Sequence, residues 1–205
     1  MKFRKSKPKK PTSDHKKFTK ELLSIGYLKN KNDEEKRLQK LGMVKDTSLS
    51  QKKDKVYVDK TGKAHVVYKG TDPKDIRDLA TDAALAIGLG RFTPRFRNAK
   101  RLAKKVKEKY GSDNAAAYGH SLGGSLATES GLKERVTYNK GVGIGGIGKQ
   151  MRRGQTDYRN DGDAVSVLSK FSKYKNKSGG DGGTHNERVT VGGTPLAAHA
   201  LDTLQ

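Results

Sequence analysis

One short stretch of the sequence holds the residue types of a nucleophilic catalyst. GHSLG (119–123) matches the pattern G-x-S-x-G. In that pattern the serine occupies a sharp turn between a strand and a helix, and the flanking glycines let the two elements approach without Cβ clashes. Small residues at 114–118 precede the serine, and a helical pattern over 122–128 follows it. We therefore predict that Ser121 is a nucleophile.

A serine nucleophile needs a base to take its proton, and the base needs a carboxylate to orient it. In the fold that uses this turn, the order along the chain is serine, aspartate, histidine. The chain after Ser121 offers these groups in that order: Asp157, Asp161 and Asp163, then His185 and His199. His185 lies in a glycine-rich stretch that we expect to be a surface loop, so His199 is favoured as the base. His120 is too close to the serine to act as its base, and we expect it to pack against the turn.

The elements that must position these groups alternate between strands and helices. We expect two strands around a turn at 59–62, helices over 76–87 and 99–110, and a buried strand that ends at the serine. Further strands are expected at 135–139 and 156–160, with a last helix at 195–204. Such alternation predicts an α/β fold, with a mainly parallel sheet covered by helices on both faces.

The N-terminal part of the chain differs in composition from the rest. Residues 1–13 are rich in Lys and Pro, and we expect them to be disordered. Residues 14–42 show two narrow helical faces, which predicts two helices that pack only lightly on the main domain. We therefore divide the chain into a basic N-terminal arm (1–53) and a catalytic domain (54–205).

Charge and composition restrict the partners and cofactors. The formal net charge is +22, and hydrophobic residues make up only 32% of the chain. So large a positive charge favours anionic partners such as a membrane surface or nucleic acid. There is no cysteine, and no cluster of residues has the spacing of a metal site, so we predict neither a metal nor a cofactor. The chain shows no apolar run long enough to span a membrane and no secretory signal at its N-terminus, and we expect an intracellular or virion location.

Four stretches beyond the serine motif resemble the class 3 lipases, the fungal-type triacylglycerol lipases of the α/β-hydrolase class. They are VVYKGTD (66–72), DIRDLATD (75–82), YRNDGDAVS (158–166) and AHALDTL (198–204). With the serine motif they extend over residues 54–205, in the family's order.

The resemblance implies a role for each matching residue. Ser121 would attack an ester carbonyl, His199 would move the proton, and Asp163 would orient His199, with Asp161 as the alternative acid. The backbone N–H groups of Thr71 and Leu122 would form the oxyanion hole.

Two departures from the family pattern concern the loop beside the serine. Lys69 stands where the family usually has an arginine, and a lysine cannot form the arginine's planar fork of donors. We therefore expect the support of this loop to differ. RFTPRF (91–96) replaces a His-x-Gly-Phe stretch, and residues 72–88 could form either a lid or an ordinary packed helix.

Two functions of different classes follow. The favoured one is a serine esterase or lipase that hydrolyses triacylglycerol or phospholipid through an acyl-enzyme, in the service of a virus particle that must breach a membrane. The alternative is a non-catalytic structural or binding protein that uses the hydrolase fold as a scaffold. Its basic arm would then dock on nucleic acid or on a capsid.

Overall fold

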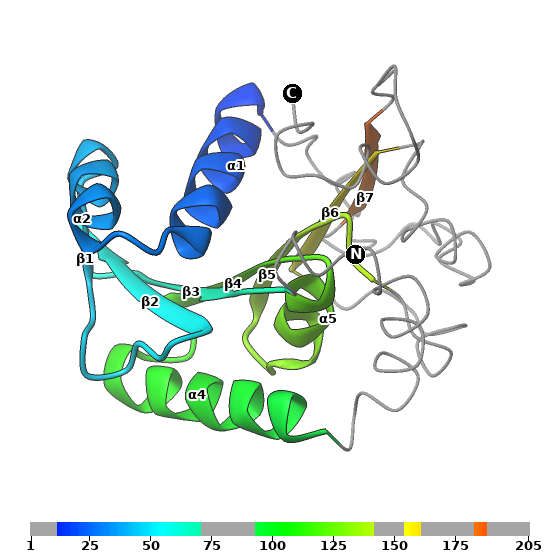
Figure 1. Cartoon of the computed structure of the whole chain (residues 1–205). Helices are drawn as coiled ribbons and strands as arrows, with labels where there is room; N and C mark the ends of the chain where they lie inside the picture. Colours follow the sequence, from blue (N-terminus) through cyan, green and yellow to red (C-terminus); the bar gives the residue numbers. More distant parts are fainter. Residues whose placement is uncertain (1–11, 71–92, 142–153, 161–182, 188–205) are drawn as a thin grey trace, which may run out of the picture.

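The sheet of this protein orders its strands as they occur along the chain. The computed structural model describes residues 12–70, 93–141, 154–160 and 183–187 (Figure 1). Its seven strands are β1 (Met43–Lys45), β2 (Asp54–Asp59), β3 (Ala64–Tyr68), β4 (Ala115–His120), β5 (Glu134–Tyr138), β6 (Gln155–Asn160) and β7 (Gly183–Glu187). β1, β2 and β3 pair antiparallel, and all pairs from β3 to β7 are parallel. The predicted mainly parallel sheet is confirmed, whereas β1 and β7 were not predicted.

Helices cover both faces of this sheet, as the alternation of elements predicts. α1 (Ser13–Tyr27) and α2 (Lys31–Lys40) lie over one face, and α4 (Pro94–Tyr110) and α5 (Leu122–Glu129) lie over the other (Figure 1). Each face has its own hydrophobic cluster, because neighbouring residues of the central strands point to opposite sides. On β3, Val66 belongs to the cluster under α4 and α5, and Val67 belongs to the cluster under α1.

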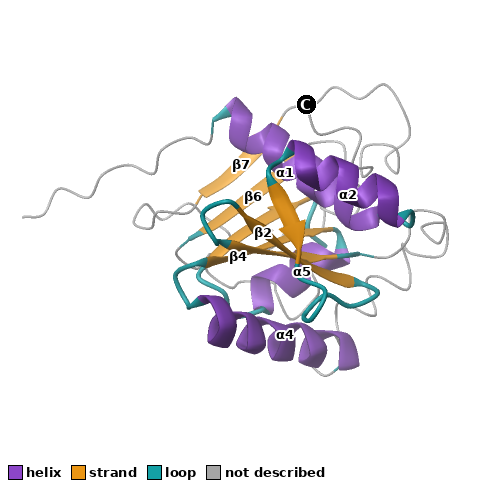
Figure 2. Ribbon diagram, turned by 90° about the vertical axis from the view of Figure 1, so that its left-hand side faces the viewer, coloured by secondary structure: helices purple, strands orange, loops and turns teal. Residues whose placement is uncertain are grey.

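The packing of α1 differs from the expectation. We expected the N-terminal helices to pack only lightly, but Leu22, Leu23 and Ile25 are fully buried against the sheet. A Cβ atom on Gly26 would lie 2.6 Å from a methyl group of Val67, so the helix backbone approaches β3 closely. Figure 2 shows both N-terminal helices lying across the sheet, opposite α4. The compositional boundary between residues 53 and 54 therefore does not coincide with an edge of the described hydrophobic core.

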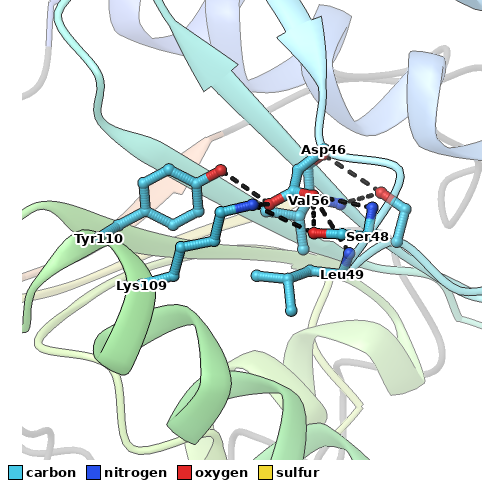
Figure 3. A network of polar contacts seen from close by, with 7 residues as sticks. Asp46, Ser48, Leu49, Val56, Lys109 and Tyr110 are labelled. Atoms are coloured by element: carbon cyan, nitrogen blue, oxygen red, sulfur yellow. Dashed lines mark hydrogen bonds and ion pairs between the residues drawn. The ribbon is translucent and has the colours of Figure 1, made fainter.

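A polar network ties the segment after β1 to the last turn of α4 (Figure 3). One oxygen of Asp46 accepts hydrogen bonds from the hydroxyl and amide of Ser48 and from the amide of Leu49. The other oxygen accepts from Lys109 Nζ at 2.8 Å and from the Tyr110 hydroxyl at 2.7 Å. The side chain of Asp46 is only 4% exposed, so the network replaces the water that this carboxylate loses on folding.

We expect Asp46→Asn to destabilise the protein by about 1–2 kcal/mol at pH 7, because hydrogen bonds to a charged group are lost and Lys109 is half exposed to screening water. Burial alone would raise the pKa of Asp46, but the hydrogen bonds from Lys109, Ser48 and Tyr110 outweigh it and hold the pKa below its ordinary value of 3.8. A lowered pKa stabilises the fold above the unfolded value, and this contribution is lost as the pH falls. Urea unfolding at pH 7 and below pH 4 should therefore show the difference between the two proteins shrinking in acid.

Asp113→Asn is the matched control for this measurement. Asp113 is 81% exposed and pairs with the exposed Lys133, so its loss should change the free energy of unfolding by less than about 0.5 kcal/mol. An Asp46→Asn protein as stable as this control would contradict the assignment of the network.

Candidate active site

The serine of the G-x-S-x-G stretch lies on the turn that the sequence predicts. β4 ends at His120, α5 begins at Leu122, and Ser121 between them has φ 56° and ψ −126°. A positive φ is uncommon for any residue other than glycine and costs about 1–3 kcal/mol, so the surroundings must impose it. The Ser121 N–H donates to the Tyr138 carbonyl at 3.2 Å, and the Ser121 carbonyl accepts from the Gly141 and Gly124 amides at 3.2 and 3.0 Å. The end of β5 thus holds the serine in this conformation.

The two glycines of the motif are required by the closeness of the backbones. A Cβ atom on Gly119 would lie 2.0 Å from the carbonyl oxygen of Gly123. A Cβ atom on Gly123 would lie 2.0 Å from the carbonyl oxygen of Tyr68, at the end of β3. Real Cβ atoms do not approach so closely, so only glycine fits at either position, as the sequence pattern predicts.

The chain directly after β3 also lies against the serine turn. A Cβ atom on Gly70 would be 2.7 Å from the His120 carbonyl oxygen and 3.4 Å from the Ser121 Cβ. Leu122 directly follows the serine and is the first residue of α5, so its amide belongs to the N-terminus of that helix. Free amides at a helix N-terminus carry partial positive charge, which suits a developing oxyanion.

The structure describes two of the five residues in the predicted site. Ser121 and Leu122 lie together at the carboxyl end of β4. Thr71, Asp163 and His199 lie outside the described residues, as do the alternative acid Asp161 and the lid candidate 72–88.

His185 is not in a loop, contrary to the expectation. Its backbone belongs to β7, where it pairs in register with Tyr158 of β6. The glycine-rich composition around it concealed a short edge strand.

Asp157, one of three aspartates that follow the serine, is already engaged in other contacts. It lies on β6, buried, and accepts hydrogen bonds from Thr137 at 2.5 Å, Lys140 at 2.8 Å and Gln155 at 2.9 Å. Burial raises the pKa of Asp157, but the charge and hydrogen bond of Lys140 outweigh it and lower the pKa below its ordinary value. These three contacts tie Asp157 to β5, to the residue pair after β5 and to its own strand.

His120 packs against the serine turn, as expected. Its ring stacks on Tyr138, with ring centroids 5.5 Å apart, and forms a T-shaped pair with Tyr27, with ring centroids 6.3 Å apart. His120 Nδ1 lies 3.5 Å from the Tyr27 hydroxyl. The ring is thereby held among aromatic side chains from α1 and β5.

Sequence reasoning missed three residues near the serine: Tyr27, Arg95 and Lys140. Tyr27 and Arg95 contact the loop after β3, and Lys140 packs beside Gly124 of α5. Of the three, only Arg95 is indicated by the sequence. It lies in RFTPRF, a stretch that departs from the lipase pattern, and it contacts the loop in which Lys69 replaces the family's arginine. Tyr27 lies 43 residues from its partner Gly70, and no local pattern reports so distant a contact.

Metal and membrane features are absent from the part of the chain that the structure describes. No group of three His, Asp or Glu residues there could hold a metal ion. No helix among the same residues is long and apolar enough to cross a membrane.

A strained serine between a parallel strand and a helix, in a mainly parallel sheet with helices on both faces, defines an α/β-hydrolase. Residues 19–140 match the family described as phospholipase-like, the Tle-like phospholipase domain. This match covers more than half of the chain, and the chain belongs to that family. The protein is therefore a carboxylic ester hydrolase that acts on lipid esters, which confirms the broader prediction but does not single out the class 3 lipases.

Two solved structures resemble the fold at low sequence identity. The Francisella virulence factor BioJ is 11% identical with a TM-score of 0.46, and the similarity covers 83% of this chain and 88% of BioJ. A carboxylesterase from Mesorhizobium loti is 12% identical with a TM-score of 0.41, covering 76% of this chain and 95% of the esterase. A comparison with curated protein sequences finds no match.

Proposed function

We propose that this protein hydrolyses acyl esters of phospholipids with Ser121 as the nucleophile. The observation that carries the proposal is the backbone of Ser121, which is held at φ 56° directly before the N-terminus of α5. Strain of this kind persists where it has a use, and a turn of this shape presents a serine hydroxyl above the sheet.

The reaction proceeds in two acyl transfers. Ser121 Oγ attacks the ester carbonyl carbon, and His199, oriented by Asp163, takes the serine proton. The tetrahedral intermediate expels the alcohol, which receives that proton, and leaves an acyl-enzyme. Water then attacks the acyl group by the same steps and releases the fatty acid.

The oxyanion that forms on the carbonyl oxygen needs hydrogen-bond donors. We assign these to the backbone N–H groups of Leu122, the first residue of α5, and of Thr71, the residue after Gly70. Gly70 lies against Ser121, which supports a donor from this loop. One such donor is worth roughly 3–4 kcal/mol in the transition state.

The charge of the described surface favours an anionic phospholipid over triacylglycerol. α4 exposes a row of basic side chains: Arg97, Lys100, Arg101, Lys104 and Lys105. The acidic residue of this helix, Glu108, contacts Lys104 at 3.8 Å. Each basic residue near an anionic membrane contributes about 1 kcal/mol to binding. A role in breaching a membrane for a virus particle extends this proposal and rests on the charge and the lipase resemblance alone.

The test is hydrolysis of vesicles of anionic phospholipid, of zwitterionic phospholipid and of triacylglycerol emulsion by the full chain and by Ser121→Ala. Ser112→Ala, which replaces an exposed serine in the turn after α4, is the matched control. We expect Ser121→Ala to lose activity by at least about a thousandfold with its fold intact, because alanine keeps the Cβ atom and removes the attacking hydroxyl. The control should keep full activity, and anionic vesicles should be the best substrate.

Three results would count against the proposal. Activity that survives in Ser121→Ala would exclude Ser121 as the nucleophile. A preference for neutral emulsions would exclude the anionic phospholipid. A folded protein with no activity and no labelling by a fluorophosphonate would favour the alternative of a non-catalytic scaffold.

A further inference from the structure

One peptide unit beside the serine is held from both of its polar ends. The carbonyl of Lys69 and the N–H of Gly70 belong to the same peptide. Arg95 Nη2 donates to the Lys69 carbonyl at 2.7 Å, and the Gly70 N–H donates to the Tyr27 hydroxyl at 2.9 Å. Both contacts are made by side chains, so the sheet does not fix this peptide by itself.

The two side chains come from opposite faces of the sheet. Tyr27 is the last residue of α1, and Arg95 lies in the first turn of α4. Figure 1 shows α1 and α4 on opposite sides of the strands. The loop after β3 is therefore contacted from both helical layers.

Each side chain is itself fixed by further contacts. Arg95 Nη1 lies 3.0 and 2.9 Å from the two carboxylate oxygens of Asp54, whose side chain is 1% exposed. The Tyr27 ring contacts the ring of His120, and the ammonium of Lys69 lies 5.0 Å from the Tyr27 ring centre. Neither residue can leave the peptide without breaking a second interaction.

Gly70 explains why this peptide needs two hydrogen bonds from side chains. A Cβ atom at this position would meet the His120 carbonyl oxygen at 2.7 Å, so only glycine fits against the serine turn. Glycine leaves its own two backbone dihedrals almost unrestricted. Because peptide units are planar, only these two rotations separate the held peptide from the next one, which carries the Thr71 N–H.

We propose that Tyr27 and Arg95 are positioning residues, which hold the Lys69–Gly70 peptide in place against the serine turn, one peptide before the amide assigned to the oxyanion. This inference rests on the proposed function, in which that amide is an oxyanion donor. It makes the N-terminal helix part of the catalytic apparatus, although α1 carries none of the reacting groups.

The test compares Tyr27→Phe and Arg95→Gln with Tyr57→Phe in the full chain. Tyr57 is the matched control, because its buried hydroxyl also makes a hydrogen bond, to Glu34 at 2.8 Å, within the layer under α1 and α2. The measurements are kcat and KM on a p-nitrophenyl ester, the rate of labelling by a fluorophosphonate, and thermal unfolding. The phosphoryl oxygen of that label occupies the place of the oxyanion, so its rate reports on the donors.

We expect Tyr27→Phe and Arg95→Gln each to lower kcat and the labelling rate about 10–100-fold, with KM changed less than about twofold. Loss of a whole donor costs about 10²–10³-fold, and these changes displace the donor without removing it. Because both residues hold one peptide, the double variant should lose little beyond the worse single variant. Tyr57→Phe should lower the unfolding temperature but not kcat.

The inference is overturned if Tyr27→Phe and Arg95→Gln, where folded, match Tyr57→Phe in kcat and labelling rate. Tyr27→Phe removes a single hydroxyl and leaves the ion pair between Arg95 and the buried Asp54 intact, so it keeps the test decisive if Arg95→Gln does not fold. Ser121→Ala, measured in parallel, distinguishes a failure of the proposed function from a failure of this inference. Activity that survives in Ser121→Ala overturns the proposed function and this inference with it, whereas loss there with normal kcat in the positioning variants overturns the inference alone.

Discussion

Gly123→Ala is expected to abolish activity and to lose most of the native fold. The added Cβ atom would lie 2.0 Å from the Tyr68 carbonyl oxygen, 2.9 Å from its carbon and 3.0 Å from the Gly70 amide nitrogen. All three neighbours are backbone atoms, at the end of β3 and in the loop after it, so no side-chain rotation relieves the clash. Either α5 must move away from β3, which destroys the serine turn, or the central strands must separate.

Circular dichroism and ester hydrolysis on the purified variant measure this effect, and Gly124→Ala is its control. Its Cβ atom would meet the Lys140 Cβ at 3.1 Å and the Gly119 carbonyl oxygen at 3.2 Å, which asks for a shift of a few tenths of an ångström. Alanine is also the better helix former by about 1 kcal/mol, which offsets part of that cost. A Gly123→Ala protein that is folded and active to the level of Gly124→Ala would refute the geometry of the turn.

Lys140→Met is expected to destabilise the protein by about 3–5 kcal/mol, because it leaves the Asp157 carboxylate buried without its charge partner. The side chains of both residues are only 9% exposed, and their charged atoms are 2.8 Å apart. Methionine keeps the Cβ and Cα atoms that lie beside Gly124, so the activity of the folded variant should change less than its stability. Urea unfolding and ester hydrolysis measure the two effects.

The loss of stability in Lys140→Met should depend on pH. In the wild type the lowered pKa of Asp157 stabilises the fold above its ordinary value of 3.8, and this contribution is lost as the pH falls. In Lys140→Met only burial and the neutral donors act on Asp157, so the pKa of Asp157 should rise. The stability that the variant loses relative to the wild type should therefore be smallest in acid. The gap in unfolding free energy should therefore narrow as the pH falls.

Lys140→Met with Asp157→Asn is the compensating pair. Asparagine keeps an oxygen for Thr137 and Gln155 and removes the buried charge, so the double variant should recover much of the lost stability. A double variant no more stable than Lys140→Met would show that the loss comes from packing and not from charge.

The central strands, α4 and the serine turn could be predicted from local sequence patterns. The alternating residues of β2, the continuous apolar run of β3, the apolar spacing of α4 and the glycines around Ser121 each describe their own surroundings. Strand pleat, helix period and backbone clearance all act within a few residues. β1 was missed because three residues give no periodicity, and β7 because it follows a glycine-rich stretch at 179–183 that is typical of a loop.

What the sequence could not supply are contacts between distant segments. The apolar face of α1 is narrow, and nothing within it reveals that Leu22 and Leu23 complete the core beneath β3 and β4. The partners of Lys140 and Tyr27 likewise depend on how strands are ordered and helices are laid across them.

The order of strands in the sheet also bears on how the chain folds as it is synthesised. Each described strand from β2 to β7 pairs with the described strand made just before it, so a growing chain can extend the sheet in one direction without rearrangement. α1 is the exception, because it is made first while its partners Tyr118 and Val136 follow about a hundred residues later. Until β4 and β5 emerge from the ribosome, the apolar side of this helix can cover only β3 and the strands before it, so part of its apolar surface stays exposed during synthesis.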